Sequence, residues 1–260
     1  MAKISEKTRT FEMDLDLAQS PETVWRALTD AEELTRWFPL EARVNPVKGG
    51  SWWLSWNDRW KFDWKIELWE PGKHLRLTED REESVQLVID FQLAEQADGT
   101  RLRVVHSGFG QGADWDNEYE DISRGWYYEL RSLRHYLTRH PGKKRHMVML
   151  VQPTNLDART CASLMMGPSA LVAQGNAADV PEGQPYKMRS VFGENLDGRV
   201  LVNQKPSPFA GVVTSLDDGL LRFEHCEQTV MLVLAVWGDR ADDVAAFQKR
   251  WQPKLQQLFG

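Results

Sequence analysis

Hydrophobic and polar residues alternate near the start of the chain, and this alternation predicts a strand. Four apolar side chains, each separated from the next by one residue, would share one face of it. A period of two is typical of a strand with one buried face. These apolar residues are Phe11, Met13, Leu15 and Leu17.

Two short helices are predicted to follow this strand. Ser20 has the residue type of an N-cap, and Pro21 suits the first helical position because its missing N–H would have no helical partner there. Asp30 can cap a second helix. Pro39 disfavours helical backbone at the residue before it, so the second helix should end by then.

Further strands and one long helix complete the first half. Apolar residues at a period of two predict an aromatic strand, and apolar residues three and four apart further on predict a long amphipathic helix. The strand carries Trp60, Phe62, Trp64, Ile66 and Leu68 on one face, and the helix carries Tyr119, Ile122, Trp126, Leu130, Leu133 and Leu137.

The second half repeats this order of elements more faintly: a strand, a helix, several strands and a closing helix. Residues 230–236 are all apolar, so this strand should be covered on both faces, by the other domain or by a second subunit. Pro253 is expected to kink or restart the last helix. The expected apolar stripe of that helix is Ala241, Val244, Ala245, Gln248, Trp251, Leu255 and Leu258.

The chain length and a Pro-Gly pair near the middle of the chain indicate two domains. A chain of 260 residues is comfortable for two, and the basic segment 141–146 begins with a Pro-Gly pair that is typical of a connection. We therefore predict a first domain at residues 1–140, a linker at 141–146 and a second domain at 147–260. A basic run at a helix end is expected to be solvated.

The net charge and the composition exclude several classes of binding partner. The formal net charge of -6 argues against nucleic acid as a partner. No apolar run is long enough to span a membrane, and residues 1–7 lack a signal core, so a cytoplasmic protein is expected. Cys161 and Cys226 show no CxxC spacing and the histidines no ligand spacing, so we expect no metal and no cofactor. Free thiols are expected, with a single disulfide left open.

Three stretches of the first half carry a family pattern. They are Ser20–Asp30 continued by Leu34–Pro39, then Glu70–Leu75, and finally Gly99–Phe109 with Gly125, Trp126 and the leucines of the long helix. In order and spacing, residues of about 8–138 resemble the homologues of the activator of heat-shock protein 90 ATPase. These belong to the START-like (SRPBCC, helix-grip) superfamily. The second half lacks these motifs and is interpreted as a divergent START-like repeat.

The resemblance implies an α+β fold of two tandem helix-grip domains, each a curved antiparallel sheet wrapped around a long C-terminal helix. In such a fold an apolar cavity lies between sheet and helix. Trp64 stands where such sequences usually have a small residue, so it should reshape that cavity. The implied function is non-catalytic binding of a small hydrophobic molecule, in stress response, transport or signalling.

Aromatic residues are the candidate ligand contacts. The chain has 12 tryptophans, ten of them between Trp25 and Trp126, and such rings either line a ligand site or fill the interior. His106 is the candidate polar group, as a ligand-orienting residue or a general base, with a histidine bonded to backbone as the plainer interpretation. The predicted ligand-binding residues are Trp37, Phe38, Trp53, Trp56, Trp64, His106, Trp115 and Trp126.

The sequence leaves other functions open. A cyclase or hydratase using His106 and a nearby carboxylate is one, and a co-chaperone-like protein contact or homo-oligomer is another. Gly108–Ala113 formally matches a dinucleotide fingerprint, but the preceding strands are expected to be antiparallel. The acidic residues that follow would also repel a pyrophosphate and suit a helix N-terminus instead.

Overall fold

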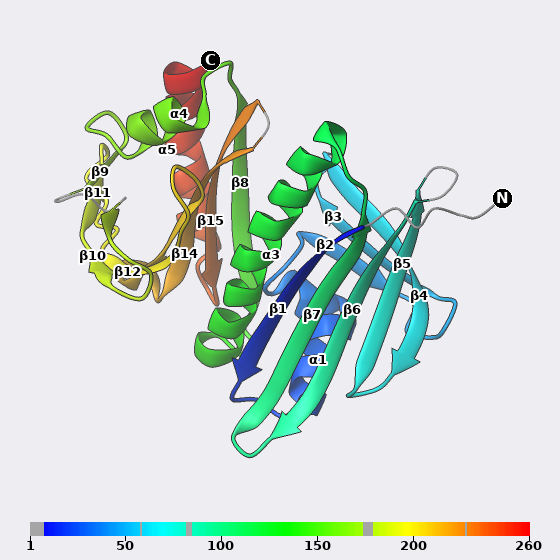
Figure 1. Ribbon diagram of the computed structural model, residues 1–260. Helices are drawn as coiled ribbons and strands as arrows, with labels where there is room; N and C mark the ends of the chain where they lie inside the picture. The colour runs from blue at the N-terminus through cyan, green and yellow to red at the C-terminus, as the bar shows by residue number, and fades with distance from the viewer. Residues whose placement is uncertain (1–7, 58, 82–84, 174–178, 227) are drawn as a thin grey trace. The chain divides into compact units, whose positions relative to one another are not determined.

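The computed structural model divides the chain into two compact units, Met1–Gly142 and Lys143–Gly260 (Figure 1). Each unit has its own sheet and its own long C-terminal helix. Residues 1–7, on which the expected location partly rests, lie outside the described part of the chain. The structure describes residues 8–57, 59–81, 85–173, 179–226 and 228–260.

The first unit has the predicted order of one strand, two helices, several strands and a long helix. Its elements are β1 (Arg9–Leu17), α1 (Pro21–Thr29), α2 (Ala31–Thr35), β2 (Glu41–Val44), β3 (Ser51–Trp56), β4 (Trp60–Glu70), β5 (His74–Arg81), β6 (Val85–Gln96), β7 (Gly99–Phe109) and α3 (Ala113–Arg139).

Local sequence explains the start of this unit. The side chain of Ser20 accepts a hydrogen bond from the backbone N–H of Thr23, and Pro21 is the first residue of α1. Asp30 ends α1 through its backbone N–H and begins α2 through its side chain, which accepts from the N–H of Glu33. Both predicted caps are therefore confirmed.

The sheet of the first unit is antiparallel, with strand order β1-β7-β6-β5-β4-β3-β2. Every strand beyond β1 lies next to its neighbour in sequence, and the last strand returns to pair with the first. Three leucines of α3, at positions 130, 133 and 137, are buried with the inner face of this sheet. The helix stripe predicted from their spacing is confirmed at these positions.

The second unit starts with a strand and closes with a helix. Its elements are β8 (Arg145–Pro153), α4 (Ala158–Met165), β9 (Leu171–Ala173), β10 (Pro185–Tyr186), β11 (Met188–Ser190), β12 (Gly198–Asn203), β13 (Phe209–Val213), the 3-10 turn η2 (Thr214–Leu216), β14 (Gly219–Cys226), β15 (Thr229–Trp237) and α5 (Ala241–Phe259). Arg145 and His146, which the sequence places in a linker, begin β8.

The main sheet of the second unit follows the same rule as the first. Read from its first strand, the order is β8-β15-β14-β13-β12-β10, again first strand beside last and then backwards along the chain. Helix α5 packs on β8 and β15, and α4 packs against β14. The fold class of two antiparallel sheets, each with a C-terminal helix, is confirmed. Common descent of the two halves stays a prediction.

Two expectations for the second unit have clear outcomes. All nine residues of β15 are buried, so the strand is covered on both faces as its pattern predicts. Helix α5 continues through Pro253 without restarting. Its predicted stripe is wrong at Ala241, Ala245 and Gln248, which are exposed. The buried residues are instead Phe247, Trp251, Leu255 and Phe259.

The remaining observations concern disulfide bonds, membrane-spanning helices and metal-binding groups. Cys161 and Cys226 are not joined by a disulfide bond. Among the described residues, no helix is long and apolar enough to cross a membrane. No group of three or more His, Cys, Asp or Glu side chains in the described part of the chain could hold a metal ion.

Candidate functional site

The inner face of β3 and β4 is built from aromatic side chains. Because strand side chains alternate between faces, Trp52 and Trp56 share the inner face of β3. Trp52 lies opposite Trp64 of β4 in the antiparallel register, and both are buried. The period-two spacing of these residues therefore places an aromatic layer under the helices of the first unit.

Phe38 is the centre of this aromatic layer. It follows α2 and stacks on Trp37, with 4.8 Å between the ring centroids. Its ring also lies 4.9 Å from that of Trp56, 6.1 Å from Trp52 and 5.5 Å from Trp126 of α3. Such distances are those of rings in contact, so side chains fill the middle of the first unit.

His106 lies inside the same layer, with 3% of its surface exposed. Its Nδ1 accepts a hydrogen bond of 3.0 Å from the indole N–H of Trp126. Its ring is 5.5 Å from Trp64 and 4.6 Å from Phe109. A nitrogen that accepts carries no proton, so a neutral His106 is protonated on Nε2. The described partner of Nδ1 is an indole of α3.

Two other buried indole groups of the layer are bonded to backbone. Nε1 of Trp37 donates to the carbonyl of Ala27 at 2.9 Å, and Nε1 of Trp52 donates to the carbonyl of Leu28 at 3.0 Å. Both acceptors lie near the end of α1, where carbonyl groups have no helical partner. These two tryptophans therefore stabilise the fold as well as fill it.

Trp115 lies at the N-terminal end of α3 and is half-buried. Its ring is 6.4 Å from Phe109, which also contacts Tyr119 at 5.3 Å. The approach of Trp115 to the chain requires a glycine, because a Cβ at Gly110 would lie 2.4 Å from Nε1 of the indole. The glycine-rich segment thus serves ring packing beside an antiparallel strand, not a βαβ unit.

Trp53 is separated from the other predicted contacts. It points to the opposite face of β3 from Trp52 and Trp56, and the guanidinium of Arg43 lies 4.3 Å from its ring centroid. The other seven predicted residues belong to the inner aromatic layer. Trp53 is separated because side chains along a strand alternate between its two faces. The prediction grouped tryptophans that are close in sequence and did not take this alternation into account.

Three further rings join the layer that sequence reasoning did not select. Trp52, Phe91 and Phe109 contact the predicted residues. Trp52 could have been found, since it alternates with Trp56 on one strand. Phe91 and Phe109 come from β6 and from the end of β7, and only the sheet order brings them to Trp126 and His106.

The hairpin end of β3 and β4 holds three half-buried rings on the inner face: Trp56, Trp60 and Phe62. Trp56 and Trp60 are opposite each other in the register, and the rings of Trp56 and Phe62 are 6.0 Å apart. Trp56 also contacts buried Phe38. We call these three rings the hairpin aromatic cluster, which joins the buried interior to the surface.

A buried carboxylate holds α3 against α2. Glu33 is 7% exposed and accepts a hydrogen bond of 2.6 Å from the hydroxyl of Tyr136. Arg36 donates to the same carboxylate at 2.6 Å. The hydroxyl of Ser132 donates to the carbonyl of Trp37 at 3.1 Å. These contacts set the position of α3, and with it the position of Trp126.

The first unit is a helix-grip domain. It has an antiparallel sheet whose last strand pairs with the first, two short helices, and a long helix over an aromatic interior. Residues 18–138 match the model of the family described as activator of Hsp90 ATPase homolog 1-like protein. The first unit belongs to this family, as its three motifs predict. Among curated proteins, none matches the chain.

Several solved structures are similar to the chain. Protein MLL2253 from Mesorhizobium loti is 26% identical, with a TM-score of 0.45, over 51% of this chain and 98% of its own. The Aha1 dimer from Colwellia psychrerythraea is 22% identical, with a TM-score of 0.46, over 52% of this chain and 99% of its own. DynU16, a putative protein in the dynemicin biosynthetic locus, is 17% identical, with a TM-score of 0.44, over 95% and 96%.

Proposed function

We propose that the first unit is a non-catalytic module that binds a small hydrophobic molecule against the hairpin aromatic cluster. The observation that carries this proposal is the partial exposure of Trp56, Trp60 and Phe62 on the inner face of the sheet. Large apolar rings that stay in contact with water are costly, and an apolar ligand would cover them. Proteins of this family commonly bind hydrophobic ligands.

The packing of the interior supports a site at the hairpin end. Phe38 is surrounded by the rings of Trp37, Trp52, Trp56 and Trp126, so its neighbourhood is occupied by side chains. A ligand stacked on Trp56 would extend this series of rings without displacing it. Offset or edge-to-face contacts with three rings would favour a planar, uncharged molecule.

His106 supports binding over acid–base catalysis. Its Nδ1 lone pair accepts from the indole of Trp126, so a proton could reach that nitrogen only if this hydrogen bond were broken. A general base needs a lone pair that can reach the substrate. We propose that the His106–Trp126 pair positions the aromatic interior behind the hairpin cluster, and takes no part in a reaction.

Native mass spectrometry of freshly purified protein, compared with the mass after denaturation, is the first test. A co-purified small molecule at defined stoichiometry would support binding and would report the ligand's mass. An apo mass that stays unchanged after incubation with a lipid and metabolite extract would contradict the proposal.

Two tryptophans of β3 provide a matched pair of variants for locating the site. Trp56→Ala removes a ring from the hairpin cluster, and Trp53→Ala removes a half-buried ring from the opposite face. With the neutral fluorescent probe N-phenyl-1-naphthylamine, we expect Trp56→Ala to weaken binding by about tenfold or more, because one ring face contributes about 2 kcal/mol. Trp53→Ala should bind like the wild type. Equal effects of the two variants would place the ligand elsewhere.

A further inference from the structure

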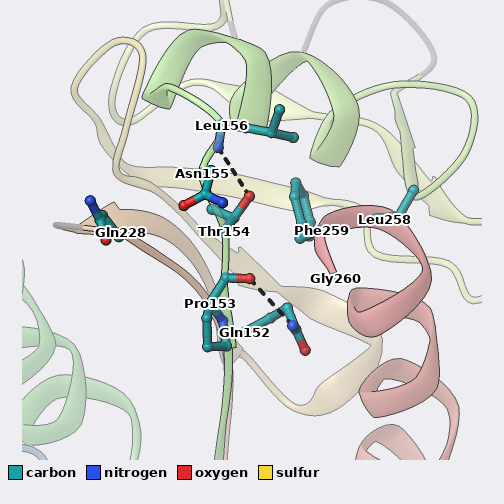
Figure 2. A pocket seen from close by; sticks show the side chains of 9 residues that line it. All are labelled: Gln152, Pro153, Thr154, Asn155, Leu156, Gln228, Leu258, Phe259 and Gly260. Carbon is teal, nitrogen blue, oxygen red and sulfur yellow. Dashed lines mark hydrogen bonds between the residues drawn. The ribbon is translucent and has the colours of Figure 1, made fainter.

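A pocket of about 520 Å³ lies in the second unit, where β8 ends and α5 ends (Figure 2). Its size is within the range of small-molecule sites. Nothing in the sequence patterns pointed to it, since its residues come from three separate segments of the chain. Its lining residues are Gln152, Pro153, Thr154, Asn155, Leu156, Gln228, Leu258, Phe259 and Gly260.

The polar side chains of this pocket are uncharged. They are the amides of Gln152, Asn155 and Gln228 and the hydroxyl of Thr154. Thr154 accepts at Oγ1 from the N–H of Leu156 at 3.2 Å, and its own N–H donates to the carbonyl of Gln228 at 2.9 Å. These bonds fix the loop after β8 to the turn between β14 and β15.

Two of the amides are available to a ligand. Within the described part of the chain, the side-chain amides of Asn155 and Gln228 make no hydrogen bond, and both residues are exposed. Figure 2 shows both on one side of Thr154, with the end of α5 on the other side. Each amide offers hydrogen-bond donors and an acceptor. The two can therefore bind a ligand group that both donates and accepts hydrogen bonds.

The opposite side of the pocket is apolar, apart from the helix end. Leu258 is half-buried, and Leu156 is 38% exposed, which is unusual for a large apolar side chain in this protein. Helix α5 ends at Phe259, and the last carbonyl groups of a helix lack helical partners. These carbonyls accept hydrogen bonds and disfavour anions.

We propose that this pocket is a second binding site, separate from the aromatic layer of the first unit. Its ligand is a small uncharged molecule that carries N–H or O–H donors beside an apolar group. Among the described residues, no charged side chain lines the pocket to neutralise an ionic ligand, and burying an unpaired charge is costly. An aromatic primary amide or alcohol has the required chemistry.

The test uses two probes of the same shape and different charge, benzamide and benzoate. Each is titrated into the full-length protein while ¹H–¹⁵N NMR spectra follow the side-chain amides of Asn155 and Gln228 and the indole groups of the first unit. Benzamide should shift the two amides saturably, with a dissociation constant that does not depend on whether it also shifts the indoles at the hairpin aromatic cluster. Benzoate should bind at least about tenfold more weakly. The absence of saturable amide shifts with benzamide, or equal binding of benzoate, would overturn the proposal.

A matched pair of glutamine variants tests the role of the amide. Gln228→Met keeps the length of the side chain and removes its hydrogen-bonding groups, and Gln248→Met does the same on an exposed turn of α5. We expect Gln228→Met to weaken benzamide binding about fivefold, the value of one typical hydrogen bond, and Gln248→Met to leave it unchanged. Equal affinities of Gln228→Met and wild type would also overturn the proposal.

Discussion

Tyr136 shows how burial changes the chemistry of one side chain. It lies in α3 with 1% of its surface exposed. Burial raises the pKa of its hydroxyl above the ordinary value of 10.0, and the hydrogen bond to Glu33 raises the pKa further. The N–H of Gly142, which donates to the same oxygen, acts in the opposite direction. The neutral form of Tyr136 is therefore part of the folded state.

This pKa shift predicts a loss of stability at high pH. Above about pH 10 the unfolded chain releases the tyrosine proton before the folded chain does, so the folded state binds more protons and stability falls as pH rises. One such group gives a slope of up to about 1.4 kcal/mol per pH unit. Urea unfolding between pH 8 and about pH 11 should show a shallower fall in Tyr136→Phe than in wild type. Parallel curves would contradict this assignment.

The tautomer of His106 is a second prediction for a single residue. Because Nδ1 accepts from Trp126, a neutral His106 should carry its proton on Nε2. Long-range ¹H–¹⁵N correlation spectra distinguish the two ring nitrogens. In Trp126→Phe, which lacks the indole donor, a population with the proton on Nδ1 should become detectable. A wild-type spectrum with Nδ1 protonated would show that the described hydrogen bond is not present in solution.

At the scale of the element, α5 shows that tertiary packing overrides a local signal. Pro253 lacks an N–H and cannot bond to the carbonyl four residues before it, yet the helix continues to Phe259. The buried side chains Phe247, Trp251, Leu255 and Phe259 recur at spacings of four. Their packing on β8 and β15 holds the helix together across the proline.

Replacing this proline should therefore stabilise the protein. Pro253 is exposed, so Pro253→Ala loses little packing and restores a backbone donor at a helix-interior position. We expect the free energy of unfolding to rise by about 1–3 kcal/mol. Gln252→Ala, at the exposed neighbouring position, should change it by less than about 0.5 kcal/mol. A loss of stability in Pro253→Ala would mean that the proline makes a favourable contact.

At the scale of the whole molecule, the chain consists of two units whose main sheets have the same type of strand order. In both sheets the first strand pairs with the last, and the others follow backwards along the chain. The family match is confined to the first unit. The second unit has a core of its own, which includes Phe223, Leu232 and Trp251. The structure is therefore consistent with two separately folding domains.

The domain organisation is directly testable. The segment of residues 1–142, expressed alone, should fold cooperatively, because its aromatic interior is built from its own strands and helices. Its NMR spectrum should keep the indole signal of Trp126 in its bonded position. A segment that remains unfolded would show that the first unit depends on the rest of the chain.

The sequence by itself determined the type and order of the elements in the first unit. Ser20, Pro21 and Asp30 act within a few residues of themselves, so their capping roles are local and can be read from the chain. The periods of two and of three to four likewise identify strands and α3. The same local logic predicted a kink or a restart at Pro253, and the helix does not restart there, because packing decides whether it continues.

Only the tertiary structure decided which residues meet. The pairing of β3 with β4 sets Trp52 opposite Trp64 and sends Trp53 to the other face, and the return of β7 brings His106 to Trp126. The pocket formed by the loop after β8, the turn before β15 and the end of α5 left no pattern in the sequence. Contacts between segments far apart in the chain depend on strand order and register, which local periodicity does not encode.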